Sequence, residues 1–149
     1  MFDDIYNQKI LELAANIPRL GRLSAPQASA SAHSRLCGSS ITIDLSLAEG
    51  RVSDYAQDVK ACALGQAASS VMGRHIIGAA PEELRSLRED MRKMLKENGP
   101  PPQGRFADAG VLEPARDYKA RHASILLVFD AVAEALDKIE QGVAAEARQ

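Results

Sequence analysis

The sequence predicts an α+β domain in which several helices pack on a small antiparallel sheet of about three strands. Residues 40–47 alternate apolar and polar side chains, which is typical of a half-buried strand, and residues 51–60 follow after a short turn as a second strand. In the second half of the chain, apolar residues recur every three or four positions, as in amphipathic helices. Few strands beside long helices favour helices packed on one sheet. We expect one domain over residues 1–149.

The elements before this hairpin are a helix and a loop. Residues 3–17 carry apolar side chains at helical spacing, and Pro18 ends the pattern. Residues 18–34 are rich in Ser, Ala, Gly and Pro, so we expect a loop or mobile linker there. In residues 51–60 the apolar positions are not quite in period 2, which indicates a bulge.

The rest of the chain is expected to be mainly helical. Apolar periodicity and terminal signals predict three helices: one between Cys62 and Gly78, one from Pro81 to about Glu97, and a last one from His122 to about Val143. A polar loop up to about Gly110 separates the last two. The last helix has the clearest apolar stripe, and we expect that stripe to be buried.

Composition excludes several function classes. The net charge is −2, so no basic field favours nucleic acid, and there is little aromatic surface on which bases could stack. No apolar run approaches the roughly 18 residues needed to span a bilayer, so no membrane partner is expected. The acidic, polar start does not fit a secretory signal, and two cysteines give no disulfide framework. We therefore expect a cytoplasmic protein.

The chemistry-bearing residues are two cysteines and one histidine. Cys37 precedes the first hairpin strand, Cys62 lies between the second strand and a helix, and His122 begins the last helix. Two thiolates and an imidazole suit zinc or iron better than hard cations, and the start of a helix favours a thiolate. Each residue also has a structural interpretation, as a small buried cysteine or a core histidine. His33 and His75 are weaker candidates.

Three motifs give the combination a family context. They are Cys37-Gly38 before the hairpin, the run ACALGQAAS over residues 61–69 at a helix start, and Pro114-Ala115-Arg116 leading to His122. Together they resemble the U-type iron–sulfur cluster assembly scaffolds, namely IscU, SufU and the N-terminal domain of NifU. The likeness covers about residues 35–140, and the middle motif is the most specific.

The resemblance implies a cargo site with two departures from the family pattern. It carries over Cys37 and Cys62 as ligands of a cluster or metal. Ser39 stands where the family has an aspartate, and His122 is taken as the replacement of the family's third cysteine, although a histidine cannot accept a persulfide. We therefore expect a scaffold or carrier, not an enzyme, that binds a transient iron–sulfur cluster or a single iron or zinc ion through Cys37, Cys62 and His122.

Two other functions stay open. One is a zinc-dependent sulfur-transfer partner of a cysteine desulfurase, and the other is a metal-free interaction module with the same fold. The resemblance implies a cysteine desulfurase and iron–sulfur acceptor proteins or carriers as partners. We expect a monomer or a weak homo-oligomer.

Overall fold

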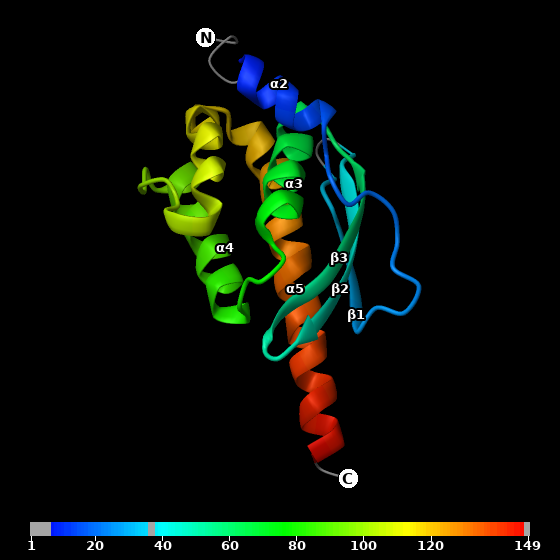
Figure 1. The fold of residues 1–149 in the computed structure, drawn as a ribbon. Coiled ribbons are helices and arrows are strands. Elements are labelled where there is room, and N and C mark those ends of the chain that lie inside the picture. Colours follow the sequence, from blue (N-terminus) through cyan, green and yellow to red (C-terminus); the bar gives the residue numbers. More distant parts are fainter. Residues whose placement is uncertain (1–6, 36–37, 148–149) are drawn as a thin grey trace.

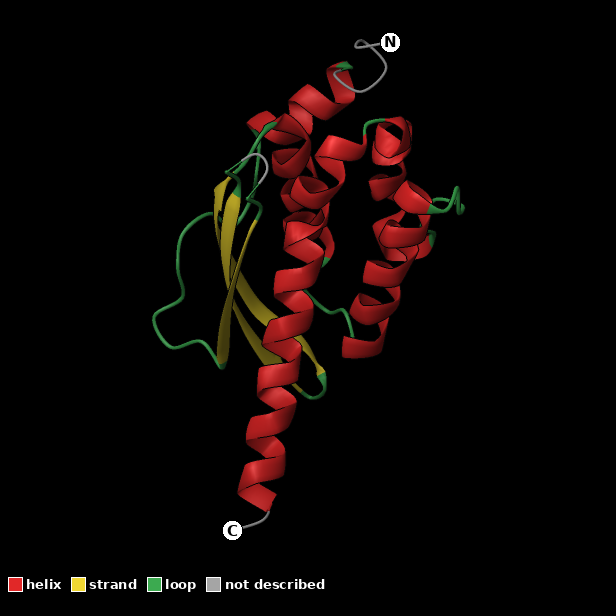
Figure 2. Cartoon of the chain, turned by 180° about the vertical axis from the view of Figure 1, so that it is seen from behind, coloured by secondary structure: helices red, strands yellow, loops and turns green. Residues whose placement is uncertain are grey.

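The computed structural model of the protein describes residues 7–35 and 38–147, with side chains up to residue 142. It confirms an α+β fold with a long C-terminal helix. The elements in chain order are α2 (Gln8–Ala15), β1 (Ala28–His33), β2 (Ser40–Ala48), β3 (Arg51–Lys60), α3 (Ala63–His75), α4 (Pro81–Lys96), two 3₁₀ segments (Gly104–Asp117 and Lys119–Arg121) and α5 (His122–Ala147). Helices α3 and α5 lie between the sheet and α4 (Figure 1; Figure 2).

The sheet is antiparallel throughout, in the order β1-β2-β3. β2 and β3 form the predicted hairpin. Ser46 pairs with Asp54 and Leu47 pairs with Val52, so β3 has one extra residue at Ser53. This irregularity is the predicted bulge, and it restores the alternation that brings Val52 into the core.

The predicted loop over residues 18–34 is wrong for Ala28–His33, which form the edge strand β1. This strand alternates alanine and serine: Ala28 and Ala30 are buried, whereas Ser31 is exposed. Alanine and serine bury little apolar area and have low strand propensity. The alternation of the two residues therefore did not stand out as the apolar and polar alternation of a strand. The small alanine side chains face α5, which packs against β1.

The core lies between the sheet and the two central helices. The predicted stripe of α5 is buried at every position whose side chain the structure describes: His122, Ile125, Phe129, Val132, Leu136 and Ile139. α3 is buried along most of its length because α2, α5 and β3 all pack against it. The expected polar loop gives way at Gly104 to a 3₁₀ segment that packs on α3 and α4. Within residues 7–35 and 38–147, no helix is both long and apolar enough to cross a membrane.

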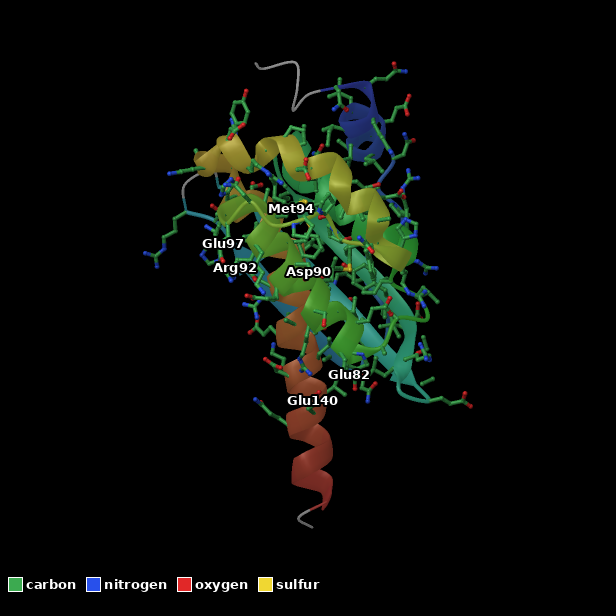
Figure 3. All side chains as sticks on the ribbon, turned by 90° about the vertical axis from the view of Figure 1, so that its left-hand side faces the viewer. Glu82, Asp90, Arg92, Met94, Glu97 and Glu140 are labelled. Atoms are coloured by element: carbon green, nitrogen blue, oxygen red, sulfur yellow. The ribbon has the colours of Figure 1, made fainter. Side chains whose placement is uncertain are left out.

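α4 is joined to α5 by exposed ion pairs beside a buried apolar stripe. Arg85 donates to Asp137 and Glu140, and Arg88 donates to Asp130, at 2.7 Å in each case. Figure 3 looks onto this side, with Glu140 of α5 below α4. Exposed pairs contribute about 0–1 kcal/mol each. The attachment therefore depends mainly on the buried residues Leu84, Leu87, Met91, Met94 and Leu95.

A buried carboxylate fixes the segment before β1 to the sheet. Asp44 of β2 has a fully buried side chain and accepts hydrogen bonds from the Arg22 guanidinium (2.7 and 3.0 Å), Leu23 N (2.9 Å) and Ser29 Oγ (2.5 Å). We call these four residues the Asp44 cluster. The hydrogen bond from Arg22 lowers the pKa of Asp44 to about 2. In Figure 1 the segment runs over the side of the sheet away from α5.

Candidate functional site

Cys62 is the N-cap residue of α3 and joins that helix to β3. Its backbone is extended (φ −67°, ψ 170°), and its carbonyl accepts the helical hydrogen bond from Gln66 N at 2.9 Å. The side chain makes no capping hydrogen bond, and it is half-buried. The thiol is therefore held at a helix N-terminus with its sulfur left for other partners.

The partner of that sulfur is Ser124, in the first turn of α5. Cys62 Sγ lies 3.3 Å from Ser124 Oγ, which in turn lies 3.1 Å from Ser39 Oγ, just before β2. Both serines are only 2% exposed, and in each pair either atom can donate. We call these residues the Ser39–Ser124–Cys62 cluster. It joins three segments that are far apart in the sequence.

Gly65 explains how α5 comes so close to the start of α3. A Cβ atom built on Gly65 would lie 2.6 Å from Ser124 Oγ and 3.2 Å from the Ser124 carbonyl oxygen. Any side chain at position 65 would clash with the Ser124 hydroxyl and with the Ala61 side chain and would crowd the Ser124 carbonyl. The glycine therefore makes room for the contact between Cys62 and Ser124.

The cluster opens to solvent through a shallow hollow. Its lining includes Gly38, Ser39, Lys60, Cys62 and Gln66. Gly38 is the residue that follows Cys37 in the sequence. The predicted ligand Cys37 itself lies outside the described residues.

His122 begins α5, as predicted, but the structure gives it other contacts. Its ring is 3% exposed, and Nε2 lies 3.1 Å from the carbonyl oxygens of Ala115 and Arg116. Since carbonyl oxygens only accept, Nε2 is the nitrogen that donates to them, so a ligand could reach the ring only through Nδ1.

The helix geometry also separates His122 from the cysteine. Residues two apart on an α-helix point roughly 200° apart around the axis. Ser124 faces Cys62, so His122 faces the other way, toward a hollow that Lys96, Arg116 and Lys119 also line. In the described part of the chain, the side chain brought to Cys62 from α5 is that of Ser124 rather than His122.

The weaker candidates lie elsewhere. His33 is exposed at the end of β1, whereas His75 Nε2 lies 2.8 Å from Asp108 Oδ2 and its ring meets Phe106 edge-on. Across residues 7–35 and 38–147, a range that leaves out Cys37, there is no group of three His, Cys, Asp or Glu side chains that could hold a metal ion.

The sequence pattern did not predict a role for Ser124. Two signals pointed to it: a serine in the otherwise apolar start of the last helix, and a glycine three residues after Cys62, which permits close helix approach. His122 attracted the prediction because imidazole is a common metal ligand. Its place on the buried stripe of α5 already indicated a core-facing ring.

Fold and site together define a small α+β domain with a cysteine at the start of its central helix. Residues 5–124 match the model of the NifU-like N terminal domain, and the chain belongs to that family. The predicted resemblance to the U-type scaffolds is thereby confirmed. These are scaffold proteins rather than catalysts.

Individual relatives agree with this assignment. The chain is 30% identical over 142 residues to the iron–sulfur cluster assembly scaffold protein IscU of Thermotoga maritima, covering 95% of this chain and 99% of that protein. The crystal structure of a NifU-like N-terminal protein from Brucella abortus superposes with a TM-score of 0.93. The two sequences are 59% identical, and the match covers 94% of this chain and 97% of that chain. A SufU-type structure from Fervidobacterium islandicum AW-1, 19% identical with a TM-score of 0.82 and coverage of 90% and 98%, shows the shared fold.

Proposed function

We propose that this protein is an iron–sulfur cluster assembly scaffold or carrier that holds transient cargo at the start of α3. The cargo is an iron–sulfur cluster or a single iron or zinc ion. One observation carries the proposal: Cys62 lies at a helix N-terminus, half-exposed in a hollow whose rim includes Gly38. Cys37, which precedes Gly38, and Cys62 are the proposed thiolate ligands.

His122 stays a prediction as the third ligand. Its Nε2 atom is engaged by two carbonyl groups, so a metal would have to use Nδ1. A site with fewer than four strong protein ligands leaves a position open to water or to a partner's thiol. Such an open position suits transfer of cargo rather than its permanent storage.

The proposal includes partners and location. A cysteine desulfurase supplies sulfur and acceptor proteins or carriers receive the cluster, with the protein acting as a single cytoplasmic domain, monomeric or weakly associated. Its role is to hold and pass on cargo, not to turn over a small substrate.

A second function is favoured by the environment of the Cys62 sulfur. Ser124 Oγ can donate to it, and Lys60 lines the same hollow. A hydroxyl donor and an ammonium group can hydrogen-bond the terminal sulfur of a persulfide formed on Cys62. In sulfur transfer, the Cys62 thiolate would attack the outer sulfur of a donor persulfide, forming a new S–S bond as the donor leaves as its thiolate. A zinc-dependent partner of a desulfurase would use this step.

Anaerobic reconstitution of the full chain with ferrous iron and sulfide tests the first function. We expect visible absorption with iron and acid-labile sulfide in the wild type, and loss of most of it in Cys37→Ser and Cys62→Ser. Ser31→Ala, an exposed change on β1, serves as the control and should keep the full complement.

Three results would redirect the proposal. A Cys62→Ser variant with undiminished iron and sulfide would place the cargo elsewhere. A persulfide on Cys62 after incubation with a persulfide donor, without cluster uptake, would establish sulfur transfer. A wild type that takes up neither iron, sulfide, zinc nor persulfide sulfur would leave the metal-free interaction module.

A further inference from the structure

We propose that the free edge of β1 pairs with β1 of a second copy of this chain, which joins two three-stranded sheets into one continuous antiparallel sheet. The inference concerns an edge of the sheet and not the cargo site. It rests on the proposed function only for the expectation of weak association, and it names the surface through which that association occurs. It starts from the backbone groups of the two edge strands and the partners that these groups already have.

The register shows which residues of β1 direct their backbone groups away from the sheet. Just beyond the paired residues of β1 and β2, Ser34 N donates to Ser39 O at 2.8 Å, so this pair continues the antiparallel register as a hydrogen-bonded pair. Hydrogen-bonded and non-hydrogen-bonded pairs alternate along an antiparallel ladder. The N–H and C=O groups of Ser29, Ser31 and His33 therefore point away from β2, toward the free edge.

Most of this edge has no partner within the fold. Lys138 of α5 donates to the Ser29 carbonyl oxygen at 2.7 Å. Within residues 7–35 and 38–147, the outward N–H and C=O groups of Ser31 and His33 have no hydrogen-bond partner, and both residues are exposed. Natural proteins usually protect an edge strand with lysine, proline, a bulge or a covering segment. Ala28–His33 contain no lysine and no proline, so the edge stays open to another strand.

The opposite edge of the sheet is covered by the chain itself. Backbone groups of residues 19–21 bond to the N–H and the C=O of Gln57 in β3, at 3.0 and 2.9 Å. Backbone groups of residues 78–79 bond in the same way to the N–H and the C=O of Val52, at 2.9 and 2.8 Å. A pair of chains joined through β1 would therefore present two covered edges. Such pairing closes at a dimer and does not continue into a fibre.

The open edge is complementary to itself, which is why we assign it to a second copy. When two copies of β1 run antiparallel about a twofold axis at Ser31, this residue faces Ser31 of the partner subunit, and Ser29 faces His33 of the partner subunit. All three outward residues then exchange backbone hydrogen bonds, and no like charges stand opposite each other. A carbonyl oxygen has two lone pairs, so Ser29 can also keep its hydrogen bond from Lys138.

The length of β1 sets the strength of this association. The strand has only 6 residues, so a single strand pair buries less than the roughly 1,200 Å² at which stable interfaces begin. The dimer should therefore be weak and should dissociate on dilution.

Sedimentation equilibrium of the full chain, reduced and treated with a chelator, measures the association without disulfides or bound ions. The average mass of the wild type should rise with concentration toward that of a dimer. Ser31→Pro removes an N–H that points outward, so the ladder between β1 and β2 is retained. Both subunits lose a donor, and the dissociation constant should rise at least about tenfold. Ser31→Ala keeps the N–H and should leave the dissociation constant nearly unchanged.

Charges at position 31 test whether this residue meets its own copy. Ser31→Lys and Ser31→Glu should each weaken association, because like charges would face each other across the axis. An equimolar mixture of these two variants should associate at least as strongly as the wild type. Ser53→Lys, the same change at an exposed position of β3, is the matched control and should leave association unchanged.

Three results would overturn the inference. They are a wild type that stays monomeric at the highest soluble concentration, a Ser31→Pro dimer as strong as that of the wild type, and a mixture of the charged variants that associates no better than either alone. Circular dichroism checks that each variant folds; if Ser31→Pro does not, the mixture of charged variants decides.

Cluster uptake is measured separately, as bound iron and acid-labile sulfide. If the wild type dimerises through β1 but takes up no iron and sulfide, the proposed function fails and this inference stands. If the wild type assembles a cluster but stays monomeric, this inference fails and the proposed function stands.

Discussion

Two polar clusters, one around Asp44 of β2 and one that includes Ser39 just before β2, differ in charge and in enclosure. The Asp44 cluster surrounds a carboxylate with four hydrogen bonds, two of them from a guanidinium, and leaves no part of that carboxylate exposed. The Ser39–Ser124–Cys62 cluster is joined by longer contacts between uncharged hydroxyls and a half-exposed thiol. The carboxylate of the Asp44 cluster makes its hydrogen bonds within the fold, whereas the Ser39–Ser124–Cys62 cluster lies beside a solvent-accessible hollow.

The difference follows from what each kind of group costs to bury. An ionised carboxylate must be compensated by strong donors, and charge-assisted hydrogen bonds are roughly twice as strong as neutral ones. Neutral hydroxyls contribute only about 0.5–1.5 kcal/mol per hydrogen bond. We infer that the charged cluster stabilises the fold and that the neutral cluster can be rearranged by a ligand at little cost.

The largest expected effect comes from removing the charge at the first cluster. Asp44→Ala should lower the free energy of unfolding by about 3 kcal/mol, because Leu23 N and Ser29 Oγ lose their acceptor and the segment before β1 loses its anchor. Denaturant titration measures the loss. Asp58→Ala, an exposed carboxylate on β3, is the control and should cost less than about 0.5 kcal/mol. A loss below about 1 kcal/mol for Asp44→Ala would contradict the structural role.

The pH dependence sharpens the same point. The folded-state pKa of Asp44 is lowered from 3.8 to about 2, chiefly by the hydrogen bond from Arg22. A lowered pKa gives stability that is present above about pH 4 and lost as the pH falls toward about 2. The stability difference between the wild type and Asp44→Asn should therefore shrink by about 2 kcal/mol between about pH 4 and pH 2. A constant difference across this range would show that the charge of Asp44 is not what matters.

The fold was predictable from sequence wherever the pattern was local and strongly apolar. The hairpin and the three later helices follow from periodicity and terminal residues, and the bulge follows from a break in period 2. β1 was missed because its inward residues are alanines and its pairing, Ala28 with Leu45 for example, joins distant positions. An edge strand of small residues takes its stability from β2 and α5, which its own composition does not reveal.

The site was predictable in part for a related reason. The position of Cys62 at a helix start is a local property and was predicted correctly. Which residue of the last helix meets it is a tertiary property, set by the rotation of α5 about its axis and by the room at Gly65. A change of two residues along the helix turns the contacting face by roughly 200°, so the chemistry of a residue alone does not tell which side chain of the last helix meets Cys62.

The smallest expected effect tests the second cluster. Ser124→Ala should lower the free energy of unfolding by only about 1 kcal/mol, since the hydroxyl contacts are neutral and water can reach the half-exposed Cys62. Chemical denaturation of the metal-free protein gives the value. Ser31→Ala, which removes the exposed hydroxyl contact with Thr42, is the matched control and should cost less than about 0.5 kcal/mol. A loss near about 3 kcal/mol for Ser124→Ala would make the hydroxyl cluster a structural anchor equal to Asp44. The contrast between a closed charged cluster and an open neutral one would then fail, and with it the reason for expecting a ligand to rearrange the second cluster so easily.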